Sequence, residues 1–192
     1  QERALLERLE IGPGEVWVGD RNFCVRTFLC RLHRAAAAFV MRWHRSACPY
    51  DAIEPLHAAP HSSGGVLEQH VWILDPHTGQ RLQVRRIVLP LDTPTRNGDT
   101  ELVLVSDLPD PIPADVLCAL YRSRWKIETH YQRLTQQLHC EPPGLNHPRA
   151  ALFAFAMALT AAEALALVQQ ALQSQHGREA VEEMSYSMVV LE

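Results

Sequence analysis

The sequence predicts an α/β fold in which a β-rich segment is inserted between a core and a helical C-terminal layer. A short apolar run, residues 16–18, ends at Gly19 and Asp20, as is typical of a strand with an acid at its tip. Further β-like runs gather between residues 48 and 105, and long helical segments follow the proline-rich stretch 109–113. With 192 residues, 47% of them hydrophobic, the chain is long enough and apolar enough to bury a core.

The first 48 residues predict alternating helices and strands. Residues 5–9 have the pattern of a helix end, which the Gly-Pro-Gly sequence at 12–14 terminates. After the strand at 16–18, residues 22–33 have helical spacing, and residues 37–43 predict a second strand.

The middle of the chain predicts a β-hairpin. Residues 69–74 and 81–89 are β-like, and the Asp-Pro-His-Thr-Gly sequence at 75–79 has the chemistry of a turn. Residues 102–105 predict a third strand. We therefore interpret residues 49–105 as the inserted β-rich segment.

Two long helices are predicted for the C-terminal part, over residues 114–138 and 148–173. Pro113 suits the first helical position, where its missing N–H costs nothing. The most apolar stretch, residues 150–168, is rich in alanine and contains a threonine and a glutamate, so a buried helix is favoured over a membrane span.

The charge is unevenly distributed. The formal net charge of −4 argues at first sight against a nucleic-acid binder. Residues 21–50, however, contain no acid and six arginines: Arg21, Arg26, Arg31, Arg34, Arg42 and Arg45. This block is either a solvated helix face or a phosphate-binding surface, since six unpaired arginines repel one another unless an anion neutralises them.

Other chemical motifs are weak. The five cysteines form no Cys-x-x-Cys pair, which argues against disulfides or a structural zinc site and favours a reducing cytoplasm. Four histidines cluster loosely, but their spacing matches no standard ligand motif: His57, His61, His70 and His77. The sequence has neither a nucleophile elbow nor a glycine-rich phosphate loop.

The densest group of chemically active residues lies in the first long helix. Four polar side chains fall within an arc of about 60° on that helix: Tyr121, Arg124, Glu128 and Thr135. An apolar stripe adjoins them: Val116, Leu120, Ile127, Tyr131, Leu134 and Leu138. A carboxylate at this edge suits Mg²⁺, and the arginine and tyrosine suit a phosphate. The spacing is equally that of an ordinary i,i+4 ion pair between Arg124 and Glu128.

The string LYRSRWKIETHYQRL, residues 120–134, resembles the Tyr-x2-Arg-x3-Glu-x6-Lys signature of the DDE transposases of the bacterial insertion-sequence-four group. Residues 16–23, Val-Trp-Val-Gly-Asp-Arg-Asn-Phe, resemble the second catalytic motif of that family, a strand that ends in Asp-Arg-Gly-Phe. Two residues depart from the pattern. Thr135 stands where the family has lysine, and Asn22 replaces a glycine, a mild change because asparagine tolerates left-handed backbone.

The resemblance implies a ribonuclease-H-like mixed sheet flanked by helices. Residues 1–48 then form the part of the core that carries the second acid, residues 49–105 the β-rich insertion, and residues 106–192 the C-terminal helices. The chain begins at Gln1 inside a helical pattern, so we expect the N-terminal strands, and the first catalytic aspartate with them, to be missing from it.

The resemblance also implies two-metal chemistry on DNA. In the family, two aspartates and one glutamate hold two Mg²⁺ ions, which activate water or a 3′-hydroxyl for attack on a phosphodiester. Asp20 would be the second acid and Glu128 the third, both as metal ligands, while Tyr121 and Arg124 would position a phosphate. Further DNA contacts would come from Arg21, Arg42 and Lys126. The implied partner is double-stranded DNA, as transposon ends and target, with a possible homodimer, no membrane and a bacterial cytoplasmic location.

Two acids alone should hold paired metals poorly, so we expect this chain by itself to have little or no strand-transfer activity. The alternative is a non-catalytic DNA-binding remnant or domesticated module, which would bind DNA without Mg²⁺ and in a salt-dependent way. A third possibility, a structural domain without DNA contact, requires the arginines of residues 21–50 to be paired internally. For Trp72 and Trp125 we favour core packing over base stacking.

Overall fold

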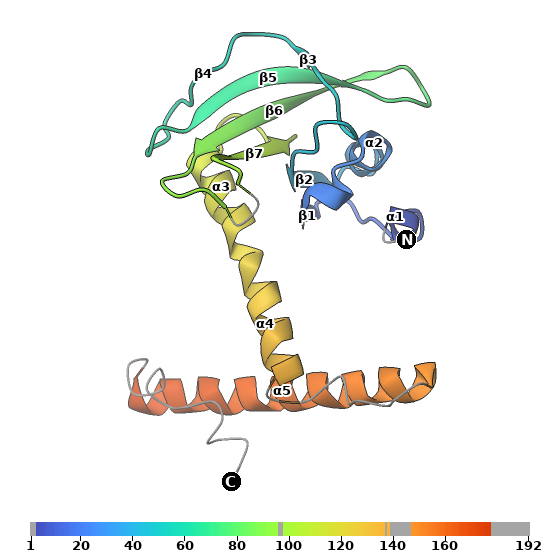
Figure 1. The fold of residues 1–192 in the computed structure, drawn as a ribbon, viewed down its shortest axis with the longest axis vertical. Coiled ribbons are helices and arrows are strands. Elements are labelled where there is room, and N and C mark those ends of the chain that lie inside the picture. The colour runs from blue at the N-terminus through green and yellow to red at the C-terminus, as the bar shows by residue number, and fades with distance from the viewer. Residues whose placement is uncertain (1–2, 96–97, 137, 139–146, 178–192) are drawn as a thin grey trace. The chain divides into compact units, whose positions relative to one another are not determined.

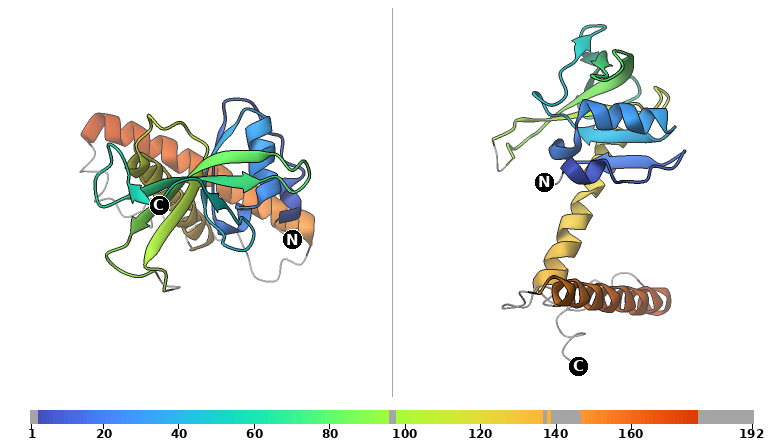
Figure 2. Two further views of the ribbon diagram at one scale, coloured as in Figure 1. Left: turned by 90° about the horizontal axis from the view of Figure 1, so that it is seen from above. Right: turned by 90° about the vertical axis from the view of Figure 1, so that its right-hand side faces the viewer.

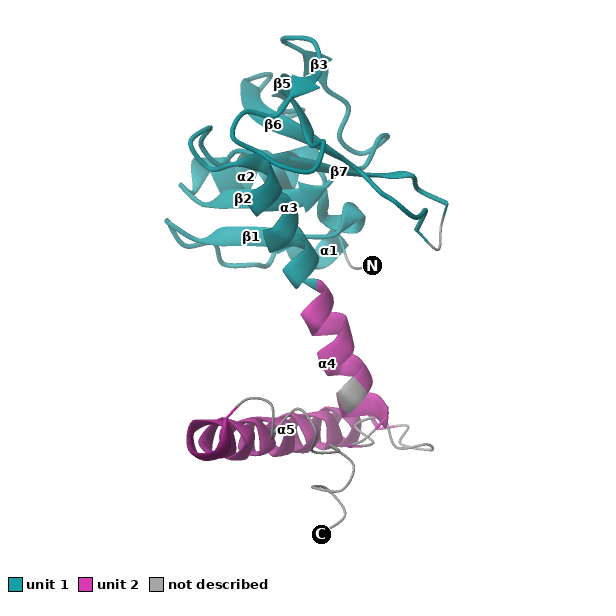
Figure 3. Cartoon of the chain, turned by 90° about the vertical axis from the view of Figure 1, so that its left-hand side faces the viewer, with its two compact units in different colours: residues 1–124 teal, residues 125–192 magenta. Residues whose placement is uncertain are grey.

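A computed structural model describes residues 3–95, 98–136, 138 and 147–177. The chain divides after Arg124 into two compact units, residues 1–124 and 125–192, which Figure 3 distinguishes by colour. Each unit is described by itself below.

Unit 1 is built on a seven-stranded sheet with the order β1-β2-β7-β6-β5-β3, in which β4 also pairs with β5 (Figure 1). β1 and β2 are parallel, and the other described pairs are antiparallel. The strands are β1 (Val16–Gly19), β2 (Ala38–Arg42), β3 (Asp51–Ala52), β4 (His57–Ala58), β5 (Leu67–Leu74), β6 (Arg81–Pro90) and β7 (Glu101–Ser106). The predicted α/β class is therefore confirmed in its coarse form, a mostly antiparallel sheet flanked by helices, which is compatible with a ribonuclease-H-like fold.

The predicted hairpin is present as β5 and β6. Asp75 shapes its turn, because one carboxylate oxygen accepts a hydrogen bond from the backbone N–H of His77 at 2.9 Å. Gly79 supplies the left-handed conformation that the turn needs, with φ of 70°. The strands of residues 49–105 continue the sheet that β1 and β2 begin, since β7 pairs with β2 and places Ser106 opposite Val40.

The sheet of unit 1 is buried on both faces. Helix α2 (Arg26–Arg34) packs through Phe28 and Leu29 on the face that carries Phe39 and Met41 (Figure 2). Helix α3 (Ala114–Ser123) packs on the opposite face, in the cluster that contains Val40. Because successive side chains of a strand point to opposite faces, the continuous apolar sequence of β2 supplies both layers.

Three predicted helices have different limits. The N-terminal helix α1 is Arg3–Leu6, and the helix predicted for residues 22–33 is a 3₁₀ turn, η1 (Arg21–Phe23), followed by α2. Asn22 therefore lies in a 3₁₀ turn, and it is not among the described residues with positive φ. The helix predicted for residues 114–138 is also divided.

The division falls at Arg124, between α3 and α4 (Trp125–Gln136). The Ser123 hydroxyl donates to the carbonyl oxygen of Leu120 at 2.7 Å, and the Arg124 N–H to that of Tyr121 at 3.1 Å. At the other end of α3, Pro113 is the N-cap with ψ of 144°, not the first helical residue as predicted.

In unit 2, α4 packs on the long helix α5 (Pro148–His176). Leu134 meets Ala158 and Ala162, and the rings of Tyr131 and Phe155 stack with centroids 6.2 Å apart.

The prediction that residues 150–168 form a buried helix is wrong for the described residues. Leu152 and Phe153 are each 68% exposed, and only Ala158 and Ala162 of α5 are buried. One neighbouring helix covers a single stripe, whereas the sequence of α5 is apolar on most of its faces. The helix is long and apolar enough to cross a bilayer, although helices of soluble cores meet the same criterion.

The apolar stripe predicted for the helix over residues 114–138 is also mostly not buried. Among its described residues, Leu134 is buried. Leu138 is half-buried, and four members are exposed: Val116, Leu120, Ile127 and Tyr131.

We predict that Gly19→Ala destabilises the protein. A Cβ atom at Gly19 would lie 2.4 Å from the sulfur of Met41, which is 1% exposed and has little room to move. Overpacking of this kind costs about 1–3 kcal/mol in the free energy of unfolding, which urea denaturation measures.

Gly12→Ala is the matched control, because its Cβ would meet the flexible end of Glu15, and the change should stay within about 0.5 kcal/mol. In the double variant Gly19→Ala/Met41→Val, the shorter side chain at position 41 leaves room for the added Cβ atom. The double variant should therefore lose less stability than the sum of the losses in the two single variants. Equal stability of Gly19→Ala and the wild type would contradict the close approach of β1 and β2.

Candidate functional site

The predicted catalytic acid of unit 1 lies directly after β1. Gly19 is the last residue of the strand, and a Cβ atom there would face Met41. Because successive side chains of a strand point to opposite faces, Asp20 lies on the face that α3 covers. There the hydroxyl of Tyr121 donates a hydrogen bond to Asp20 Oδ1 at 3.1 Å. Two motifs separated by 101 residues of sequence are thereby in contact.

Arg124 completes this group. It stands three residues after Tyr121, at the C-cap of α3, and its guanidinium carbon lies 5.5 Å from the centroid of the Tyr121 ring. The predicted juxtaposition of Tyr121 and Arg124 is therefore present. Glu128, Lys126 and Thr135 belong to α4 in unit 2.

The environment of Tyr121 keeps its hydroxyl protonated. Burial is the main cause that raises the pKa of Tyr121, and the negative charge of Asp20 raises it further, whereas Arg124 and Arg42 act in the opposite direction. A protonated phenol remains a hydrogen-bond donor, to a carboxylate or to a phosphate oxygen.

A basic pocket of about 290 Å³ lies at the end of β2. Arg21, Arg42 and Arg45 line it, together with Asp99. Arg21 and Arg42 both bind one oxygen of Asp99, at 2.9 and 2.6 Å, and the hydrogen bond from Arg21 is the main cause of a lowered pKa of Asp99. An anion in this pocket would therefore compete with Asp99 for the two guanidinium groups.

The premise that the six arginines of residues 21–50 are unpaired is wrong for five of them. Besides the two that bind Asp99, Arg34 pairs with Asp75 at 2.5 Å. Arg26 donates to the carbonyl oxygen of Leu74, and Arg31 to those of Leu6 and Leu9. Acids and carbonyls distant in sequence meet these side chains, so the local charge count could not reveal the pairing.

The two tryptophans differ in exposure. Trp72 is half-buried on β5, whereas Trp125 is 64% exposed at the start of α4. The expected core packing is therefore wrong for Trp125.

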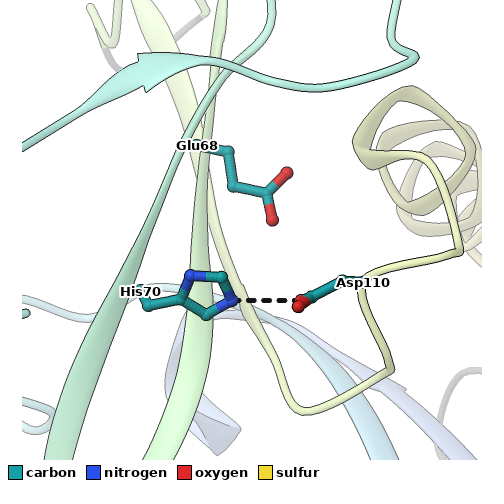
Figure 4. Close-up of side chains that lie close together, drawn as sticks. All are labelled: Glu68, His70 and Asp110. Atoms are coloured by element: carbon teal, nitrogen blue, oxygen red, sulfur yellow. Dashed lines mark hydrogen bonds and ion pairs between the residues drawn. The ribbon is translucent and has the colours of Figure 1, made fainter. Parts of the chain in front are cut away.

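A second group of ligating side chains lies apart from Asp20. Glu68, His70 and Asp110 bring three possible ligand atoms within 4.8 Å of one another and can hold a metal ion (Figure 4). Of the four histidines noted in the sequence only His70 belongs to it, and Glu68 and Asp110 were missed. The Glu-x-His spacing, which puts both side chains on one face of a strand, was the available signal.

No protein-family model and no curated protein matches the chain. The resemblance to transposases therefore stays a prediction from the sequence motifs.

The contact between Asp20 and Tyr121 predicts the titration of the tyrosine. The Asp20→Asn substitution should lower the pKa of Tyr121, because it removes the negative charge that opposes ionisation. Absorbance at 295 nm during an alkaline titration measures this, and Tyr121→Phe identifies the component among four tyrosines. Asp92→Asn, at an exposed site, should leave the titration unchanged.

The same contact predicts a stability change. Tyr121→Phe removes a hydrogen bond to a carboxylate and should cost about 1–3 kcal/mol. The pKa of Tyr121 is raised in the folded state, so the unfolded state loses this proton first as the pH rises above the ordinary tyrosine value of about 10. The free energy of unfolding of the wild type should therefore fall more steeply in this range than that of the phenylalanine variant. A Tyr121→Phe variant with unchanged stability and an unchanged alkaline slope would refute the contact.

Proposed function

We propose that this chain is the part of a DDE transposase catalytic domain that carries the second and third acids, and that it acts in Mg²⁺-dependent cleavage and strand transfer of DNA. The observation that carries this proposal is the contact between Asp20 at the end of β1 and Tyr121 on α3. It brings together two segments that separately resemble the family motifs.

The side chains around Asp20 support this function chemically. Tyr121 uses Oδ1 of Asp20, and a carboxylate has a second oxygen that suits Mg²⁺. Asp20 would hold a metal ion, which would supply an activated nucleophile and stabilise the leaving oxygen. The resemblance assigns the third acid to Glu128. The Arg124 guanidinium would hold the phosphate of the DNA end. The Tyr121 hydroxyl would join it by exchanging Asp20 for a phosphate oxygen, because it has a single proton to donate. Lys126 would add a backbone contact.

The arginines of the basic pocket would contact the phosphate backbone of DNA. Arg45 is exposed at its rim, and Arg21 is 40% exposed at its side chain. A phosphate that displaces Asp99 would gain two guanidinium groups already in position, which is the usual chemistry of backbone recognition. The bacterial cytoplasm and a dimer that bridges two DNA ends belong to this proposal.

A non-catalytic DNA-binding module is the second candidate, and one observation favours it. Among the residues that the structure describes, the group of acids and histidines suited to a metal is Glu68, His70 and Asp110, which does not include Asp20. Such a module would use the basic pocket and have no need of Mg²⁺. The ion pairs of Arg21, Arg34 and Arg42 with acids of unit 1 favour the third possibility, a structural domain without DNA contact.

Transposition by the complete encoded protein tests the catalytic proposal. Asp20→Asn and Glu128→Gln should each reduce transposition at least 100-fold, because each removes a metal-binding charge, whereas Asp92→Asn should leave it unchanged. Unchanged transposition in either acid variant would refute the assignment. For the 192-residue chain alone we expect little or no nicking of supercoiled plasmid with Mg²⁺.

Binding to a labelled DNA duplex, followed by fluorescence anisotropy between 50 and 300 mM salt, separates the remaining possibilities. Affinity should fall steeply with salt, and Arg45→Gln should weaken binding about 3- to 10-fold and reduce the salt slope by about one. Arg8→Gln, an exposed arginine outside the pocket, is the control. Binding without any Mg²⁺-dependent transposition supports the module, and no binding at 50 mM salt supports the domain without DNA contact.

A further inference from the structure

The group around His70 is formed by two different parts of unit 1. Glu68 and His70 stand two residues apart on β5 and share the face that α3 covers, and Asp110 comes from the loop between β7 and α3. His70 Nε2 lies 3.0 Å from Asp110 Oδ1, and the Glu68 carboxylate points into the same space (Figure 4).

Glu54 orients the imidazole independently of that group. Its Oε1 lies 2.7 Å from His70 Nδ1 and accepts the backbone N–H of His70 at 2.9 Å. A carboxylate bound to one ring nitrogen fixes the tautomer and directs the lone pair of the other nitrogen to a ligand position. Nε2 faces Asp110, to which it donates a hydrogen bond at 3.0 Å, and a metal ion in this space would take the place of that proton.

Arg85 holds the two carboxylate-bearing segments together. Its Nε and Nη2 donate to Glu68 at 2.6 and 3.1 Å, with both side chains at most 5% exposed. Its Nη1 donates to the carbonyl oxygens of Pro109 and Ile112, on either side of Asp110. The ligand-bearing loop is thus positioned in advance, and each oxygen of Glu68 keeps a lone pair beyond the one that Arg85 uses.

The charges of the group suit a divalent cation. Glu54, Glu68 and Asp110 bring three negative charges and Arg85 brings one positive charge. A metal ion at Nε2 would replace the His70 proton that bonds to Asp110, so the ligand group would carry a net charge of −2. Of these charges the Glu68–Arg85 pair is buried, whereas the Asp110 side chain is 70% exposed. A single divalent ion would neutralise this group.

We propose that Glu68, His70 and Asp110 form a binding site for one Zn²⁺ ion, distinct from the Asp20 site and positioned by Glu54 and Arg85. One imidazole and two carboxylates form a donor set that zinc accepts, whereas Mg²⁺ prefers oxygen ligands and retains its waters. Three protein ligands leave a fourth position for water. A pocket of about 340 Å³ opens beside His70 and Asp110, and the Asp110 side chain is 70% exposed, so an ion has an entry path.

The site joins β5 to the loop that leads into α3. A bound ion therefore clamps the start of the helix that carries Tyr121 at its other end. Because the ligands are brought together only in the folded state, binding stabilises unit 1 by mass action.

Titration calorimetry and thermal unfolding of the metal-free 192-residue chain with ZnCl₂ test the proposal. We expect one Zn²⁺ per chain and a rise in Tm of several degrees, with no such rise for MgCl₂ at the same concentration. His70→Gln and Asp110→Asn should weaken zinc binding at least 10-fold, and Glu54→Gln about 10-fold. The controls are His130→Gln and Asp92→Asn, which change exposed residues outside the group and should bind zinc as the wild type does.

Asp110→Asn alters an exposed side chain, so it tests the site even where His70→Gln disturbs folding. X-ray absorption spectroscopy at the zinc edge should find one imidazole ligand and oxygen ligands, and no sulfur ligand. Zinc bound through sulfur, equal affinity in Asp110→Asn and the wild type, or no stoichiometric binding would each overturn the proposal. None of these readouts depends on DNA or on Asp20.

Discussion

The buried ion pair between Arg85 and Glu68 connects most of unit 1. It joins β6 to β5 through two hydrogen bonds, and two more from Arg85 hold the loop that begins α3. Removing two charges from water is costly, and the four hydrogen bonds offset that cost because they satisfy both partners. Loss of one partner of such a pair typically costs about 3–5 kcal/mol, since the other charge stays buried without compensation.

The position of Tyr121 depends on this arrangement. The loop that Arg85 holds leads directly into α3, and Tyr121 lies near the far end of that helix, where it reaches Asp20. The same face of the sheet carries Glu68 and His70, so the candidate DNA site and the candidate zinc site share one layer of the fold. A change in the loop at Pro109–Ile112 would therefore affect both.

Several arginines of unit 1 are neutralised by acids that lie far from them in sequence. Asp99 and Asp75 bind arginines that would otherwise repel one another. These acids allow the sheet and α2 to form without a ligand, and they lower the affinity that the arginines can offer a phosphate. The net charge of −4 conceals this arrangement, because it averages basic residues and the acids that face them.

Much of the fold was predictable from local patterns. The strands at 16–18 and 69–74, the hairpin turn at 75–79 and the helix that starts near Ala114 follow from short-range periodicity and turn chemistry. The division at Arg124 was missed, because the helical spacing of the sequence continues across it. The exposure of α5 was missed as well, since apolar composition does not specify which faces find a partner.

For the candidate site, the sequence by itself determined the secondary-structure positions of the predicted residues: Asp20 after an apolar strand, and Tyr121 and Arg124 at helical spacing. Only the tertiary structure decided their partners. The hydrogen bond from Tyr121 to Asp20, the pairing of Arg21 and Arg42 with Asp99, and the meeting of His70 with Asp110 all join segments far apart in sequence. Periodicity encodes the face on which a side chain lies, whereas the residue opposite it depends on how the whole sheet and its helices assemble.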